Sequence, residues 1–162
     1  GESPGGYRIC LVRIFNTGPF KTRITANDTT QQEELGVWRF EAGKILRYVK
    51  ASALLPAGES VKLDSSVTTA ALMGMQVQAT DGPTNMFFGI AETTLAALNF
   101  GWVTIYGPAT GRVVTADAAG AGLGPSSNTG VLSIRNTSHF NAAAIAIQTG
   151  LSAGSAVFIS QL

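Results

Sequence analysis

The chain has few of the side chains on which most catalytic chemistry depends. Its 162 residues include one cysteine and one histidine, and only 13% are charged, against roughly 25% in average domains. The single cysteine, Cys10, excludes an intramolecular disulfide and a thiolate metal cluster. Flanked by Ile9 and Leu11, it is expected to be a small buried apolar residue. These absences lead us to expect no enzyme, no cofactor and no metal site.

Long apolar runs and dense basic clusters are also missing. The start, GESPGGYR, has neither a charged leader nor an apolar core, so we expect no secretory signal. The most apolar stretch, residues 141–160, contains glycines, serines and Gln148, which argues against a membrane span. Residues 1–62 carry nine Lys/Arg and six Asp/Glu, and residues 63–162 carry two and four. This mildly basic first part could bind an acidic partner, or it is an ordinary surface strand. Because the chain has no dense cluster of Lys and Arg, we expect no nucleic-acid partner.

Short apolar runs, separated by small and turn-forming residues, make up most of the chain. Such runs recur roughly every 8–15 residues, a spacing typical of an all-β sandwich or barrel. The 19 glycines supply corners, since glycine tolerates positive φ. Three Ala-Gly pairs, at 42–43, 57–58 and 153–154, each introduce a run. We therefore expect an all-β fold, an antiparallel β-sandwich or β-barrel of jelly-roll type, with one or two short helices at most.

Several segments allow a more specific expectation. Glu92–Leu98 is the candidate for a short helix between two strands. GWVTIYG (101–107) is expected to be a strand bounded by its two glycines, and RVVTAD (112–117) a further short strand. Residues 118–132, rich in glycine and serine, are expected to form a long turn region. Residues 1–32 are expected to form an N-terminal arm or strand, followed by a single β domain over residues 33–162.

Short motifs that match catalytic or phosphate-binding patterns lack the necessary context. GLSAG (150–154) matches the nucleophile-elbow pattern, but no His, Asp or Glu follows Ser152. The glycines of GAGLGPSS, at 120, 122 and 124, have the wrong spacing for a dinucleotide or Walker loop. His139 has no neighbouring carboxylate in the sequence and is expected to be a loop or interface residue. We therefore predict turns at both motifs and no catalytic residue.

The aromatic side chains fall inside or beside the expected strands. Trp102 and Tyr106 would offer stacking faces to a sugar if both were exposed on one face. The interpretation that we favour is that these rings fill the core. Exposure of the pair would support a carbohydrate-binding module.

Two longer stretches resemble small structural proteins of tailed bacteriophages: EELGVWRFEAGKILRYVKASALLPAGESVKL (33–63) and FGIAETTLAALNFGWVTIYGPATGRVV (88–114). In those proteins a Leu-Gly pair, here 35–36, precedes a strand, and glycine turns, here at Gly43 and 57–58, introduce the next two. The stretch GLGPSSNTG (122–130) resembles the loop before their final strand. The resemblance covers roughly residues 33–162. The resembled proteins are head decoration (cement) proteins or other structural proteins of the virion.

This resemblance implies a non-catalytic decoration protein on the outer surface of the capsid. Such a protein binds and stabilises the lattice of the major capsid protein. The resemblance also implies self-association into a homo-oligomer, most often a trimer. A tail-fibre or receptor- and carbohydrate-binding β module of a virion is the alternative, and a small hydrolase is a third reading.

Residues 7–32 form a longer and more basic front segment than the resembled module needs. By analogy with the terminal arms of decoration proteins, this segment is the candidate for docking to the shell or to a neighbouring subunit. A strand such as YRICLVRIF would add to the sheet edge of another subunit, and the cations would pair with acidic groups on the lattice. The candidate interface residues are Tyr7, Arg8, Arg13, Phe15, Phe20, Lys21 and Arg23.

Overall fold

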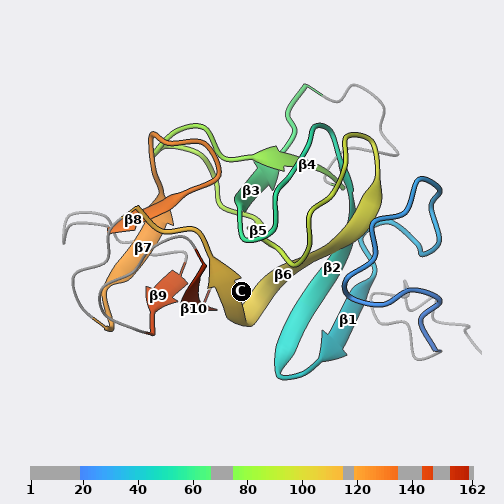
Figure 1. Ribbon diagram of the computed structural model, residues 1–162, viewed down its shortest axis with the longest axis horizontal. Coiled ribbons are helices and arrows are strands. Elements are labelled where there is room, and N and C mark those ends of the chain that lie inside the picture. Colours follow the sequence, from blue (N-terminus) through green and yellow to red (C-terminus); the bar gives the residue numbers. More distant parts are fainter. Residues whose placement is uncertain (1–18, 67–74, 115–118, 135–143, 148–153, 161–162) are drawn as a thin grey trace, which may run out of the picture.

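Strands are the only regular secondary structure in the described part of the chain (Figure 1). The structure is a computed structural model that describes residues 19–66, 75–114, 119–134, 144–147 and 154–160. This part contains no helix that is long and apolar enough to cross a membrane. The ten strands are β1 (Trp38–Glu41), β2 (Lys44–Ala51), β3 (Ser60–Leu63), β4 (Gln76–Ala79), β5 (Gly89–Ala91), β6 (Phe100–Gly111), β7 (Gly122–Pro125), β8 (Leu132–Ile134), β9 (Ala144–Ala146) and β10 (Ser155–Ile159).

Five of the strands close on themselves. β2, β4, β3, β5 and β6 are neighbours in that order, and β6 also pairs with β2, which completes a ring. The β2–β4 pairing is parallel and the other four are antiparallel. The all-β, mainly antiparallel fold expected from the sequence is thus confirmed, and the ring is its barrel form. The apolar side chains of one buried cluster belong to the ring: Val49, Ala51, Leu55, Val61, Val77, Leu95 and Val103.

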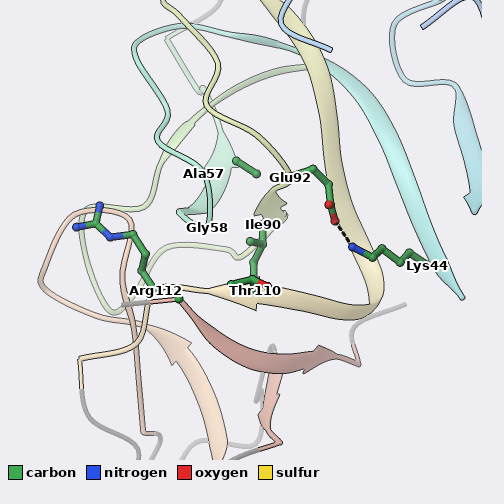
Figure 2. Close-up of a pocket in the computed structure, with 9 residues that line it drawn as sticks. Lys44, Ala57, Gly58, Ile90, Glu92, Thr110 and Arg112 are labelled. Atoms are coloured by element: carbon green, nitrogen blue, oxygen red, sulfur yellow. Dashed lines mark hydrogen bonds and ion pairs between the residues drawn. The ribbon is translucent and has the colours of Figure 1, made fainter. Parts of the chain in front are cut away.

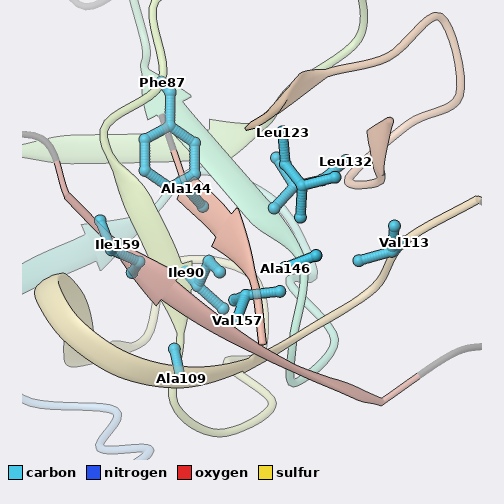
Figure 3. Packing of buried hydrophobic residues seen from close by; sticks show 10 residues of the cluster. All are labelled: Phe87, Ile90, Ala109, Val113, Leu123, Leu132, Ala144, Ala146, Val157 and Ile159. Carbon is cyan, nitrogen blue, oxygen red and sulfur yellow. The ribbon is translucent and has the colours of Figure 1, made fainter. Parts of the chain in front are cut away.

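The second half of β6 starts another group of strands. It pairs with β10, and the sheet continues through β9 and β7 to β8. Their inner side chains meet Phe87 and Ile90 from the ring, as Figure 3 shows. One strand thus belongs to both groups, and one apolar cluster lies between them.

The predicted Ala-Gly corners are confirmed where the structure describes them. Ala42 and Gly43 have φ of 52° and 74°, and Gly58 and Gly154 have φ of 83° and 95°. Ala153 lies outside the described residues. Positive φ is the conformation in which glycine meets no steric penalty, so the pairs stand where the backbone reverses into the next strand.

The prediction that a strand ends at Gly107 is wrong, because β6 runs on through Pro108 to Gly111. Gly107 bends the strand without ending it, with a φ of 99°. A Cβ at this position would lie 2.6 Å from the carbonyl oxygen of Gly43. The absent side chain thus lets the turn between β1 and β2 rest on the bend of β6.

The predicted short helix over Glu92–Leu98 is also wrong. Leu95 forms an isolated bridge with Leu55, and each backbone N–H donates to the other's carbonyl, at 2.8 and 2.9 Å. Both leucines are fully buried in the ring cluster. Burial and these two long-range hydrogen bonds outweigh the local helix propensity of the alanines and leucines.

Two further expectations need correction. Residues 118–132 were expected to form a turn region, but Gly122–Pro125 is strand β7, paired with both β8 and β9. Fully buried Leu123 anchors this strand in the apolar cluster. In the predicted strand 112–117, the described residues 112–114 contain only an isolated bridge between Val113 and Leu132. Residues 115–118 lie outside the described part.

Candidate docking surfaces

Residues 20–28, which we call the arm segment, lie along the ring with alternating burial. Phe20, Thr22, Ile24, Ala26 and Asp28 are half-buried, whereas the residues between them are exposed. The alternation continues through a turn, in which the Ala26 backbone N–H donates to the Arg23 carbonyl at 3.0 Å. The segment therefore has an inner face that packs on the domain and an outer face that meets solvent.

The inner face covers the fully buried Trp102 of β6. The Phe20 ring meets the Trp102 ring edge-on, with centroids 5.3 Å apart. The indole Nε1–H of Trp102 donates to the Thr22 hydroxyl at 3.0 Å. Ile24 and Ala26 pack on the same cluster, which contains Val37, Leu46, Tyr48 and Trp102.

Two polar side chains of the domain hold the arm segment in place. Buried Glu33 accepts hydrogen bonds through Oε1 from the backbone N–H groups of Lys21 and Thr22, at 2.5 and 2.9 Å, and from the Thr22 hydroxyl at 3.2 Å. Arg39 donates to the Thr22 carbonyl at 2.6 Å, and its guanidinium lies 4.7 Å from the Phe20 ring centre. A buried carboxylate needs such donors, so Glu33 ties the segment to the domain.

The outer face of the arm segment is basic. Lys21 and Arg23 are exposed, and neither head group pairs with another described residue. They border a shallow hollow of about 420 Å³ whose lining also includes Asp28 and Gln32. The Asp28 Oδ2 atom is buried there and has no hydrogen-bond partner among the described residues.

The Tyr48 hydroxyl accepts a hydrogen bond at 3.3 Å from the backbone N–H of Gln32, which follows the arm segment in the chain. Burial is the main cause that raises the pKa of Tyr48, and the Asp28 carboxylate adds to it. The tyrosine therefore stays neutral under ordinary conditions and supports the inner face of the arm segment.

The seven candidate interface residues fall into three groups. Tyr7, Arg8, Arg13 and Phe15 lie outside the described residues. Phe20 points inward, so it packs on its own domain in this structure. Lys21 and Arg23 point outward, as docking requires. Their role as an interface stays a prediction.

A small polar cavity lies between the ring and the second group of strands (Figure 2). It has a volume of about 150 Å³. Lys44 and Glu92, on one side, form an ion pair of 2.8 Å, and the Thr104 hydroxyl also donates to Glu92. Arg112 lies on the opposite side and binds Glu59 at 2.6 Å. Since both cations already have a carboxylate partner, the cavity holds no free charge for a ligand.

The motifs singled out in the sequence lie partly outside the described residues. His139 and Ser152 lie outside the described residues, and Gly122 and Gly124 belong to strand β7. In the described ranges, no three His, Cys, Asp or Glu side chains gather closely enough to hold a metal ion.

Trp102 fills the core, as we favoured, because it is fully buried under the arm segment. Tyr106 is half-buried and lines another hollow, of about 480 Å³, together with Phe40 and Ile45. The two rings therefore do not form one exposed stacking platform.

Comparison with known proteins gives a distant likeness in structure. No family model matches the chain, and no curated protein matches it in sequence. Among solved structures, the N base of the head fiber protein gp8.5 of bacteriophage phi29 aligns with a TM-score of 0.49 and 10% identity. The alignment covers 71% of this chain and 92% of the other. A likeness this distant does not bear on the function of the chain.

Proposed function

We propose that this chain is a non-catalytic structural component of a bacteriophage virion, a decoration protein that binds the major capsid protein lattice from outside. The observation that carries the proposal is the arm segment, which is fixed to the domain by its inner face and presents Lys21 and Arg23 outward. The sequence resemblance of residues 33–162 to small phage structural proteins supplies the partner.

The distribution of charge supports docking through the arm segment. Four cations of the domain, Arg39, Lys44, Lys62 and Arg112, are already paired with carboxylates. Lys21 and Arg23 lack such partners among the described residues, so they are available to acidic groups of another protein. Opposite charges across an interface steer the encounter and fix orientation, and burial of about 800 Å² on each partner supplies the remaining affinity.

The test is binding to purified phage particles that lack the protein. We expect Arg23→Glu and Lys21→Glu each to weaken binding at least about tenfold at low salt, with a smaller loss as salt screens the charges. Lys62→Glu is the matched control, because it makes the same change in charge at a side chain that pairs with Asp81. If both arm variants bind particles as tightly as Lys62→Glu does, docking does not take place through this segment.

Deletion of residues 1–18 distinguishes the two parts of the predicted arm. It removes Tyr7, Arg8, Arg13 and Phe15 but keeps the Phe20 and Thr22 contacts that cover Trp102. If the truncated chain binds particles as well as the full chain, the docking residues lie in the arm segment. If binding is lost while the fold is retained, they lie before it.

The alternative is a receptor- or carbohydrate-binding module of a tail fibre. Because Trp102 is fully buried, a sugar would have to stack on Tyr106 instead. Tyr106 and Phe40 line one hollow and offer two rings to a sugar. Binding to a glycan array that Tyr106→Ala abolishes would favour this alternative over a decoration protein.

A further inference from the structure

A continuous strip of apolar side chains crosses the outer face of the sheet. Antiparallel pairing places Phe40 opposite Ile45, and Ile45 opposite Tyr106. Across the bend at Gly107, the Tyr106 ring meets the Phe158 ring edge-on at 5.4 Å, and Phe158 lies opposite Ile145. Directly opposed residues share one face of a sheet. We call Phe40, Ile45, Tyr106, Phe158, Ile145 and Ile147 the apolar row.

The row faces away from the core of the protein. Along β9 and β10, the alternate residues Ala144, Ala146, Val157 and Ile159 point into the buried cluster, as Figure 3 shows. Strand alternation therefore turns the residues between them outward. Ile145 is 38% exposed and the following Ile147 is 48% exposed.

We infer that the apolar row is the surface through which copies of this chain associate with one another. The inference rests on the proposed function, because it names the contact that would build a homo-oligomer of the decoration protein. Two observations point to a second copy as the occupant, the first concerning charge and the second concerning area.

The charged groups beside the row are neutralised within the chain. Glu41 and Lys44 border the hollow of Phe40 and Tyr106, but Glu41 pairs with Arg39, and Lys44 pairs with Glu92. An occupant therefore needs no countercharge. The same uncharged row on another copy meets this condition, and a two-fold arrangement would bring each row against its equivalent.

The area of the row matches the apolar part of an ordinary interface. Phe40, Ile145 and Ile147 are exposed, at 59%, 38% and 48%, and the other three members are half-buried. On the area scale of large apolar side chains the row therefore presents roughly 300–500 Å². A specific interface buries about 800 Å² on each partner, and somewhat more than half of that is apolar. Two facing rows would therefore supply most of the apolar core of such an interface.

The decisive measurement is the mass of the full chain in solution across a range of concentrations. We expect the wild-type chain to sediment as a multiple of its 16.8 kDa mass, and the double variant Ile145→Lys/Ile147→Lys to associate at least about tenfold more weakly. Met86→Lys and Leu54→Lys are the controls, since both residues are strongly exposed, at 87% and 60%, and lie in loops outside the row. Circular dichroism establishes that each variant is folded.

Ile145→Thr is the second variant, for the case that two lysines unfold β9. Threonine keeps the β-branched shape that strands favour and removes only apolar surface, so we expect a weaker but measurable loss of association. A wild-type chain that stays monomeric at about 100 μM, or row variants that associate like the Met86→Lys control, would overturn the inference.

Particle binding separates this inference from the proposed function. If the wild-type chain is monomeric but still binds particles, the inference of self-association through the row is wrong and the proposed docking stands. An oligomeric chain that row variants dissociate, but that binds no particle, would support the row and contradict the decoration role.

Discussion

Leu98 holds a backbone conformation that its side chain disfavours. Its φ is 66°, and the side chain is 58% exposed. Gly58, 40 positions earlier, has a φ of 83° and ends the corresponding stretch before β3, as Leu98 does before β6. The left-handed conformation costs a residue with a Cβ about 1–2 kcal/mol, and glycine escapes this cost.

We therefore expect Leu98→Gly to raise the free energy of unfolding by about 0.5–1 kcal/mol, after the larger entropy of glycine in the unfolded chain is subtracted. Urea unfolding measures the change. Ala97→Gly is the control: it is exposed and does not have positive φ, so the same entropy should make it slightly destabilising. A loss of stability in Leu98→Gly equal to that of Ala97→Gly would show that Leu98 is not strained.

Glu59 makes a contribution to stability that depends on pH. Burial raises the pKa of its carboxyl above the ordinary value for glutamate, and the neighbouring Arg112 opposes this rise only in part. The folded protein therefore holds the Glu59 proton to a higher pH than the unfolded chain does. Stability from this group is full below the unfolded pKa and is lost as the pH rises above it.

The expected result is that the stability of wild type, relative to Glu59→Gln, decreases as the pH rises from about 4 to 7. Thermal unfolding of both proteins across this range measures the difference. A wild-type advantage that grows with pH would mean that the ion pair with Arg112 outweighs burial, and that the pKa of Glu59 is lowered instead.

Among the elements, the arm segment is the one whose removal we expect to expose the core. Phe20 → Ala would take away the ring that lies against Trp102 and the surface over which Arg39 rests. Because Phe20 is half-buried, we expect a loss of about 2–3 kcal/mol, below the 3–5 kcal/mol of a fully buried phenylalanine. Urea unfolding measures this loss.

The emission of Trp102 should also shift to longer wavelength in Phe20→Ala, because water reaches the indole; a Trp38→Phe background isolates this signal. Thr25→Ala is the control on the exposed face of the same segment and should leave both readings unchanged. An unshifted emission maximum would show that the arm segment does not cover Trp102 in solution.

The strands were predictable where the local composition favours them, and much less so where distant pairing decides. The runs KILRYVKA and SAVFI are rich in β-branched and aromatic residues between turn residues, and they are strands β2 and β10. GLGP has no such pattern and is strand β7 only because Leu123 is buried by its neighbours. In the same way, the pairing of Leu95 with Leu55 has no signature within either segment.

The outward side of the strands was a missed signal in the sequence. The alternation of alanine and isoleucine at 144–147 already separates a small inner face from a larger apolar outer face. Phe158 and Tyr106, by contrast, come together only through the register of β10 and β6. The docking role predicted for Lys21 and Arg23 rested on their charge and on the analogy with the terminal arms of decoration proteins, and the structure adds that both side chains are exposed.

At the scale of the whole molecule, ring closure is the feature that no local pattern encodes. It depends on β2 and β6, whose paired residues Tyr48 and Trp102 are far apart in the sequence. The residue pattern of neither strand distinguishes a flat sheet from a closed one. Only the summed twist and the fit of side chains inside the ring select closure, so the sequence left sandwich and barrel open.

The shared strand β6 has a mechanical consequence. A tensile load applied between the ring and the group of β10, β9, β7 and β8 travels along one unbroken backbone from Phe100 to Gly111. The load enters β6 through the ladder to β2 and leaves it through the ladder to β10. Within each ladder the hydrogen bonds are sheared together, so several must fail at once before the two groups come apart.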